Sequence, residues 1–419
     1  MKQRYRAFLA FFRQYPLYGL YLLLLLLALG KQIILPSELV DTGEYKSSAT
    51  NLMAGKGWSA CSTADACEQL SLPETRRTPG YPMLIAIFYV SNLLLLFQFM
   101  LSAWVPFLMH KLLVKIGKET CFKIALVLLL LYPLQYYYTA MIMPDILCQV
   151  LILIGILAFI ERKWLRVSMT VIALLLLKPV FMPWAWIALI GLFWIKGKQK
   201  IWLVLPVVVV LSISWVNQKH TGVFHFSSIS VTNAFEYNIR SLTKGEFSGE
   251  EMYYRVAAVR MDSMDFKEKF HFMQNETQKA IRMSPVKYAY LHAMGFAKAL
   301  LDPGRYDFIA FFQLPQGNGF MSMGSKEIRT SQPPLYWVYI IFFALLALLK
   351  MVMSFFAVVR DLPHKTILVS TVLYMLLIVG PVGSARYLLP VMPVMIVIAA
   401  IGWAGFFNKK QHESTIAER

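Results

Sequence analysis

Long apolar runs recur along this sequence, and they constrain the fold more than any other feature. The segment from Leu22 to Leu29 contains no polar residue, and comparable runs continue almost to residue 407. About 20 apolar residues are needed for a helix to cross a hydrocarbon layer of about 30 Å. Lipid offers the backbone no hydrogen-bond partners, so such segments must form helices or closed barrels. Because the runs are continuous rather than alternating, we predict an all-α polytopic membrane protein.

Hydropathy predicts about ten transmembrane helices. The first run is followed by no small-x-small cleavage site, so we expect an uncleaved helix rather than a signal peptide. The second span is too long for one simple helix, and it is either a half-helix followed by a span or one tilted helix. The approximate boundaries are 16–35, 82–110, 124–138, 144–160, 167–180, 182–195, 201–217, 334–358, 366–383 and 387–407.

Lys and Arg are distributed unevenly between the connections, and this predicts the orientation. Cytoplasmic loops carry an excess of basic residues, and every basic connection falls on one side when ten spans alternate. We therefore expect both termini in the cytoplasm. The net charge of +18 indicates anionic membrane lipid as the partner rather than nucleic acid, because no basic stripe with interleaved aromatics occurs away from the spans. The basic residues are Lys2, Arg4, Arg6, Arg13, Lys111, Lys115, Lys118, Lys123, Arg162, Lys163, Arg166, Lys196, Lys198, Lys200, Arg360, Lys365, Lys409 and Lys410.

The same topology divides the chain into three parts. Residues 1–217 form an N-terminal transmembrane module whose first outer loop spans 36–81, and residues 334–419 form C-terminal spans with a short cytoplasmic tail. Residues 218–333 form a small, mainly helical extracytoplasmic domain. Its amphipathic patterns predict one helix over 264–283 and a second that begins at Pro285 and stops at Gly304.

The first outer loop contains a pair of acidic residues. The spacing from Asp41 to Ala54 predicts an interfacial helix that ends at Gly55. Asp41 and Glu44 are three residues apart, so they lie on one face of it. Such a pair can serve as a general base or hold a cation. The alternative is that Asp41 caps the helix and Glu44 favours its first turn.

Further charged residues fall on the same outer side. Asp145 opens the fourth span after Pro144, where it is either a site residue or a partner of the helix dipole. Lys178, Arg76, Arg77 and Arg386 bind either a substrate phosphate or phospholipid headgroups. Their convergence with the carboxylates on one face suits a lipid-linked phosphate substrate and a reaction that needs a base.

Other kinds of site find little support. The histidines lack metal-ligand spacing. If a divalent metal binds, its candidate ligands are Asp41, Glu44 and Asp145. The sequence has no Gly-x-x-x-x-Gly-Lys or Gly-x-Gly-x-x-Gly motif, which argues against ATP and dinucleotides. Cys61 and Cys67 lie together in the first outer loop, and a disulfide between them is one outcome in an oxidising compartment.

Several of these segments match one family in order and sidedness. Asp41 to Gly57, followed by Arg77-Thr-Pro-Gly-Tyr81-Pro, resembles the first outer loop of the GT-C superfamily of glycosyltransferases. The similarity is to the branch that contains protein O-mannosyltransferases and the lipid A aminoarabinose transferase. Further matches are Tyr132-Pro133 to Asp145, Leu177-Lys178-Pro179, Ala385-Arg386-Tyr387-Leu-Leu-Pro390 and Ala280-Ile-Arg-x-x-Pro285-x-x-Tyr288. This chain has lysine at 178, where the family often has arginine, and it lacks a large C-terminal soluble domain.

The resemblance implies a fold and a reaction. The fold is a helical bundle with interfacial helices over a cavity, and the donor is an undecaprenyl- or dolichyl-phosphate sugar. By analogy Asp41 is the catalytic base for an inverting displacement, supported by Asp145. Cations stabilise the leaving phosphate. No cofactor is required, and a divalent metal is left undecided. The residues implied in binding the lipid phosphate or the sugar are Glu44, Tyr45, Arg76, Arg77, Tyr81, Lys178, Arg386 and Tyr387.

Two other functions compete with sugar transfer. An O-antigen ligase or polymerase also has a long outer loop, but it uses pyrophosphate-linked glycans. A lipid or sugar transporter (flippase) usually shows internal symmetry and charges near the bilayer midplane, whereas here the charges cluster at the outer interface. We expect a glycosyltransferase of a bacterial inner membrane, with its active site outside and a lipid such as lipid A, a glycan or a protein as acceptor.

Overall fold

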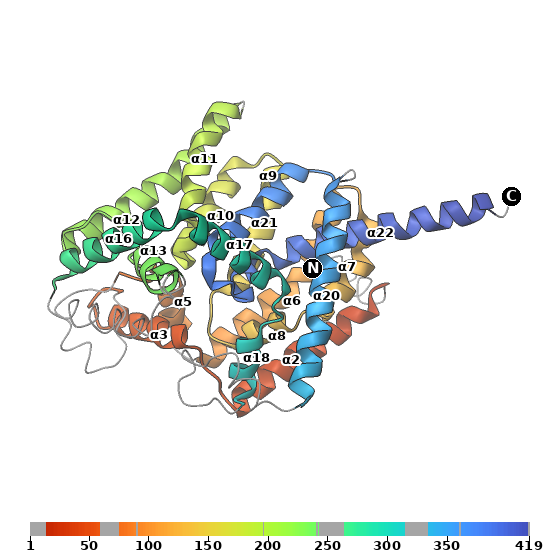
Figure 1. Ribbon diagram of the computed structural model, residues 1–419, viewed down its shortest axis with the longest axis horizontal. Coiled ribbons are helices and arrows are strands. Elements are labelled where there is room, and N and C mark those ends of the chain that lie inside the picture. The colour runs from red at the N-terminus through yellow and green to blue at the C-terminus, as the bar shows by residue number, and fades with distance from the viewer. Residues whose placement is uncertain are drawn as a thin grey trace, which may run out of the picture.

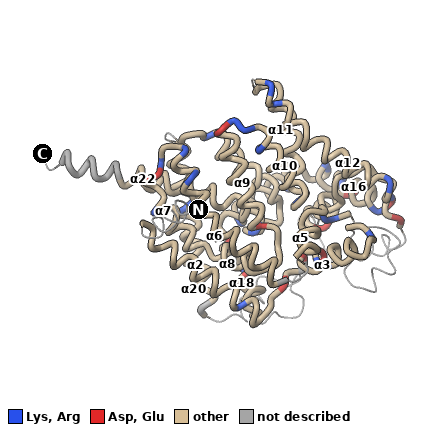
Figure 2. Tube along the Cα trace, turned by 180° about the vertical axis from the view of Figure 1, so that it is seen from behind, with Lys and Arg blue, Asp and Glu red and all other residues tan. Residues whose placement is uncertain are grey.

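The computed structural model describes residues 14–58, 75–88, 91–195, 197–239, 242, 264–314, 334–359 and 362–417. Across these residues every regular element is helical, which confirms the predicted all-α class (Figure 1). Most of the chain trace is uncharged, and Lys and Arg lie mainly at helix ends and connections (Figure 2). Cys61 and Cys67 lie outside the described residues, so the disulfide between them stays a prediction.

Six helical segments of the described chain are long and apolar enough to cross a membrane. They coincide with predicted spans at both ends of the sequence, so a multi-pass membrane protein follows from the fold. Three segments are α2 (Pro16–Ile34), α6 (Ser91–Lys115) from Asn92, and α12 (Leu205–Thr221) with the 3₁₀ turn that precedes it from Lys198. The other three are α20 (Pro334–Val359) from Tyr336, α21 (Lys365–Val379) extended to Val382, and α22 (Met392–Ala417) with the preceding turn η6 (Ala385–Val391). The last of these crosses over Ala385–Phe407.

The predicted span 124–138 is broken in the structure. It consists of α7 (Phe122–Leu130) and α8 (Pro133–Ala140), and the two helical segments are bent by 65° relative to each other. Pro133 lacks a backbone N–H and favours the first turn of a new helix, which explains the position of the break. If this pair counts as one span, the structure has up to seven.

Three further apolar helices coincide with predicted spans but are short. These are α9 (Asp145–Ile160), α10 (Trp164–Leu177) and the segment Pro179–Trp194, which ends in α11 (Met182–Trp194). At 1.5 Å per residue, the 16 residues of α9 extend about 24 Å, which is less than the usual hydrocarbon thickness. The long second span is divided into α5 (Gly80–Phe88) and α6, as the half-helix alternative predicts.

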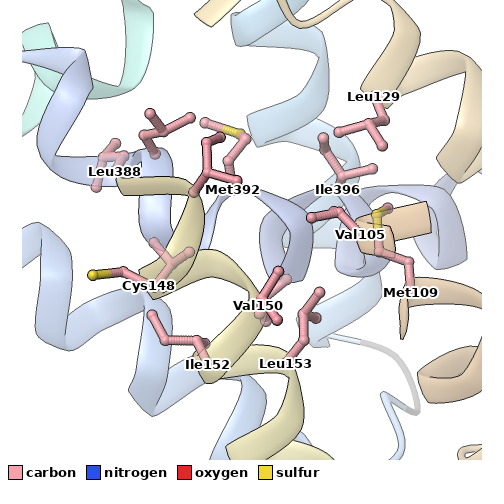
Figure 3. Packing of buried hydrophobic residues seen from close by; sticks show 14 of the residues in the cluster. Val105, Met109, Leu129, Cys148, Val150, Ile152, Leu153, Leu388, Met392 and Ile396 are labelled. Carbon is pink, nitrogen blue, oxygen red and sulfur yellow. The ribbon is translucent and has the colours of Figure 1, made fainter. Parts of the chain in front are cut away.

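The densest part of the core surrounds α9. This helix is buried along most of its length and packs against α6, α10, η6 and α22. On the other side of α22, Gly402 lies so close to α20 that a Cβ atom there would collide with the Met353 carbonyl oxygen. Figure 3 shows the residues that α9 contributes to the core together with those of its neighbours, namely Cys148, Val150, Ile152, Leu153, Val105, Met109, Leu129, Leu388, Met392 and Ile396.

The predicted outer segments contain the shorter helices. The helix predicted from Asp41 is α3 (Val40–Met53), and Gly55 follows it with a positive φ of 72°. The helix predicted over 264–283 is α16 (Phe266–Met283), which begins with a capping box between Asp265 and Glu268. The remaining outer elements are α13 (Ile229–Asn233), the π-helical turn η4 (Ala234–Ile239), α17 (Pro285–Leu301), α18 (Arg305–Phe312) and the turn η5 (Gly380–Val382).

Gly304 has a different role from the one predicted. The helix that begins at Pro285 ends at Leu301, and Gly304 is the residue immediately before α18. Its φ of 85° is left-handed, and a Cβ atom at this position would collide with the Leu134 side chain. Glycine is therefore needed where the chain turns between two helices, and it does not stop the first one.

Candidate functional site

Seven charged side chains from five segments form one continuous chain of ion pairs. Four cations alternate with three carboxylates, in the order Lys178, Asp145, Arg386, Asp41, Arg77, Glu44 and Arg76. We call this set the charge network. All seven residues were predicted from the sequence as outward-facing, and the structure brings all of them together.

The acidic pair of α3 binds Arg77. The Arg77 Nη2 atom donates to Asp41 Oδ1 at 2.7 Å, and its Nε atom donates to Glu44 Oε2 at 2.7 Å. Arg76 Nη1 lies 3.6 Å from the other Glu44 oxygen. The i, i+3 spacing of Asp41 and Glu44 therefore places both carboxylates on one helical face, as predicted. Neither side chain is used only to cap α3.

Two tyrosines that were predicted to contact substrate lie beneath Arg77. Tyr45 is buried, and the Arg77 guanidinium lies 4.8 Å from the centre of its ring. Tyr81 is also fully buried, contacts the Tyr45 ring edge-on and donates a hydrogen bond to Gln98 Oε1 at 2.6 Å. Their position supports Arg77 from below, and the described structure leaves the Tyr81 hydroxyl no direct access to a ligand.

Asp145 and Lys178 form a buried ion pair at the ends of two core helices. Asp145 is the first residue of α9 and is fully buried, while Lys178 directly follows α10 with an extended backbone. The Lys178 Nζ atom donates to Asp145 Oδ1 at 2.6 Å. A carboxylate buried in this way needs a charged partner, which argues against a role as a simple partner of the helix dipole.

Arg386 of η6 connects the two halves of the network. Its Nη2 atom lies 2.7 Å from Asp41 Oδ2, and its Nε atom lies 3.9 Å from Asp145 Oδ2. The second distance is too long for a hydrogen bond. Asp145 Oδ2 and Arg386 Nε are both buried and have no hydrogen-bond partner among the described residues. A buried acceptor and a buried donor therefore remain side by side and unsatisfied.

The arginines control the protonation of Asp41. Burial alone would raise the pKa of this carboxyl group, but the positive charges of Arg386 and Arg77 outweigh burial and hold the pKa well below its usual value. Asp41 is therefore ionised at neutral pH, with both oxygens bound. The whole network carries one positive charge in excess, which favours an anionic ligand.

Three residues near the network were not predicted from the sequence. Tyr138 lies under the Arg386 guanidinium, 5.8 Å from ring centre to Cζ, and its hydroxyl donates to the buried Asp307 of α18. Tyr237 of η4 interacts electrostatically with Asp41 and Arg386. The available signals were a carboxylate at 307, directly before the apolar run Phe308 to Phe312, and the three consecutive tyrosines at 136–138.

Two remaining expectations concern Tyr387 and metal binding. Tyr387 is partly buried next to Arg386 and interacts electrostatically with Asp41, so it borders the network, and its contact with substrate stays a prediction. In the described part of the chain, no group of three or more His, Cys, Asp or Glu side chains is arranged to hold a metal ion. Asp41, Glu44 and Asp145 each face cations.

Comparison of the chain with protein-family models, with curated proteins and with solved structures finds no match.

Proposed function

We propose that the charge network is the active site of a membrane glycosyltransferase of the GT-C type. The donor is a polyprenyl-phosphate sugar, and the acceptor is a hydroxyl group of a lipid, glycan or protein at the outer face. One observation carries the proposal. Four cations and three carboxylates meet in one place, so the site offers both phosphate ligands and a candidate base.

The chemistry follows from these two kinds of group. The acceptor oxygen attacks the anomeric carbon of the donor and transfers its proton to Asp41. The bond between the anomeric carbon and the phosphate oxygen breaks, and its electron pair leaves with the polyprenyl phosphate. The anomeric centre is inverted by this single displacement. Lys178, Arg77 and Arg386 stabilise the charge that develops on the phosphate, and the energy comes from the phosphosugar bond.

The donor must also release Asp41, because both of its oxygens are bound by arginine. A phosphate competes for the same guanidinium groups through bidentate hydrogen bonds. When Arg386 and Arg77 turn toward the donor phosphate, Asp41 loses the two interactions that hold its pKa low. Its basicity then rises at the moment when the donor is bound. Once Arg386 has turned toward the donor, the Asp145 Oδ2 atom, which is buried and has no hydrogen-bond partner among the described residues, can orient the acceptor.

The proposed setting is a bacterial inner membrane. Ten spans, counting α9, α10 and the Pro179–Trp194 segment, place both termini in the cytoplasm and the charge network outside. Opposite ends of α9 support this arrangement, because Asp145 belongs to the network while Glu161, beyond the other end, pairs with Lys115 and Lys163 of the predicted cytoplasmic loops. The positive-inside rule favours that orientation.

Sugar transfer by purified protein tests this function. We expect the wild type to consume at least one radiolabelled polyprenyl-phosphate sugar in the presence of a membrane extract as acceptor. Asp41→Asn should lose activity by a factor of about 10² to 10⁴, because an amide cannot accept the proton. The matched control is Glu38→Gln, since Glu38 is exposed and its ion pair in the described part of the chain, with Lys46, lies outside the network.

The outcomes separate the alternatives. If Asp41→Asn keeps full activity, Asp41 is not the base and the mechanism is wrong. If only pyrophosphate-linked glycans are consumed, the protein is a ligase or polymerase. Movement of a labelled lipid across proteoliposomes without any transfer would indicate a flippase. Thermal unfolding of each variant shows whether a loss of activity reflects a loss of folding.

A further inference from the structure

Helix α17 has two distinct faces, although the sequence places it in an aqueous outer domain. Its inner face packs against α20, α21, η5 and η6. Gly295 and Ala299 are buried there, and a Cβ atom on Gly295 would collide with the Gly380 carbonyl oxygen. His292 Nε2 lies 2.7 Å from the Leu377 carbonyl oxygen. The helix is therefore packed closely against elements that belong to the membrane-crossing segments.

The outer face of α17 is an apolar stripe that no other described element covers. Val286 is 81% exposed and Tyr290 is 63% exposed, and Met294 and Leu301 continue the same face at helical spacing together with Ala289 and Ala293. A helix of an aqueous domain would have polar residues at these positions. Lys287 and Lys298 lie along one edge of the stripe, the arrangement typical of helices at a membrane surface.

The stripe continues the apolar surface of its neighbours. Leu373 and Leu377 of α21 and Ile341 and Leu345 of α20 are all largely exposed. Both helices are long and apolar enough to cross a membrane, and α17 packs against both of them (Figure 1). Exposed leucines on a span face lipid. We therefore expect the adjoining stripe to have the same surroundings.

The turn after α17 packs along α20. Pro303 accepts a hydrogen bond from Tyr339, five residues beyond the start of α20 at Pro334, and Asp302 and Pro303 line a small pocket that reaches Lys350, 16 residues beyond that start. These two residues lie about 8 Å and about 24 Å along the helix axis. The chain then returns through α18, whose end contacts the outer end of α2, because Lys31 donates to the Phe311 carbonyl oxygen. The segment enters and leaves on the same side.

The backbone of the turn between α17 and α18 is hydrogen-bonded within the protein. Asp302 Oδ1 accepts the N–H groups of Gly304 and Arg305, each at 3.0 Å, and the Pro303 carbonyl oxygen accepts the Tyr339 hydroxyl at 2.9 Å. Non-helical backbone is tolerated at membrane depth only where the protein satisfies its polar groups in this way. An aqueous loop would not require such partners, since water would supply them.

We propose that residues 285–312 form a re-entrant element whose apolar stripe on α17 contacts the acyl chains of the outer leaflet. The partner is lipid, and the basic edge of the stripe lies toward the headgroups. This inference does not depend on the reaction catalysed at the charge network. It places part of the predicted extracytoplasmic domain, residues 218–333, against the membrane.

Nitroxide scanning in proteoliposomes tests the proposal. Single cysteines at Tyr290, Met294 and Leu301 are spin-labelled in a chain whose native cysteines are replaced, with Leu377→Cys as the lipid-facing reference and Gln278→Cys on α16 as the water-facing control. We expect collisions with oxygen to exceed those with a water-soluble nickel chelate at all three stripe sites, as at 377. The ratio of oxygen collisions to nickel-chelate collisions should increase from site 290 to site 301. At site 278, collisions with the nickel chelate should exceed those with oxygen.

Two results would overturn the proposal. If the stripe sites collide with the nickel chelate as often as site 278 does, α17 lies in water. If neither reagent reaches them, protein covers the stripe, either in a second copy or in another part of this chain. Because the labelled positions are exposed, the labels should not prevent folding, and a single symmetric peak in size-exclusion chromatography verifies this for each variant.

Discussion

At the scale of single residues, Asp307 is a carboxyl group whose surroundings determine its protonation. It is buried in α18, and it accepts a hydrogen bond from Tyr138, the residue that lies under Arg386. Burial raises the pKa of Asp307 to about 6, against the opposing effects of the Tyr138 hydroxyl and the Arg386 charge. Asp307 therefore titrates close to physiological pH, unlike Asp41.

The raised pKa of Asp307 predicts how stability depends on pH. The folded protein binds this proton more tightly than the unfolded chain does between about pH 4 and pH 6. The contribution is complete below about pH 4 and is lost as pH rises to about 6, a loss of about 3 kcal/mol. Unfolding in detergent micelles should show this decline for the wild type and not for Asp307→Asn.

The low pKa of Asp41 affects the stability of the protein in a different range of pH. Its contribution to stability is present above the ordinary carboxyl pKa and is lost only as pH falls below about 4. Parallel pH profiles for the wild type and Asp307→Asn between pH 4 and pH 6 would contradict the assignment to Asp307.

The sequence was sufficient to identify the members of the charge network but not their pairing. Each charge departs from the positive-inside pattern or is a carboxylate at a helix end, so it is visible locally. The pairs join residues that are 32 or more positions apart, and only the packed structure brings them together. The burial of Tyr45 and Tyr81 was missed for a similar reason, since an outer-loop tyrosine looks the same whether it lines a site or supports one.

At the scale of elements, the hydropathy pattern predicted the positions of the helices but not the break between α7 and α8. Both halves of the pair α7 and α8 are apolar, so a sliding average passes over the 65° bend between them. Pro133 was the only local signal of that break. The apolar face of α17 was missed because Lys287, His292 and Lys298 lower its average hydropathy, although its exposed face is apolar.

Close contact between α20 and α22 requires glycine at 402. A side chain at this position would collide with the Met353 backbone, and membrane helices approach closely only through small residues. We expect Gly402→Ala to destabilise the protein by about 1–3 kcal/mol or more through overpacking. Unfolding by a denaturing detergent measures the change.

Gly30 provides the matched control for that substitution. It lies inside α2, and a Cβ atom there would have no neighbour within 4 Å. Gly30→Ala should leave stability unchanged or raise it by up to about 1 kcal/mol, because alanine favours a helix. Equal losses of stability in the two variants would mean that the effect at 402 does not come from its contact with Met353.

At the scale of the whole molecule, the number of spans depends on whether the three short helices cross the membrane. We predict that they do, because Asp145 and Lys178, at the ends of α9 and α10, belong to the same network as Asp41. Cysteines at Lys163 and Lys198 should then resist an impermeant thiol reagent in intact cells, whereas cysteines at Glu38 and Lys267 should react. Labelling of 198 before the cells are permeabilised would exclude the ten-span topology.

The position of Arg386 in the sequence has a consequence for biosynthesis. Every other member of the charge network precedes residue 179, so the ribosome completes them long before it reaches η6. Until then Asp41 has one of its two arginines, and Asp145 has only Lys178. Without Arg386 the network holds three cations and three carboxylates, so the growing chain lacks the excess positive charge of the finished network through most of its insertion. The late helices close the bundle and add Arg386, which completes the ion pairs of Asp41 and Asp145.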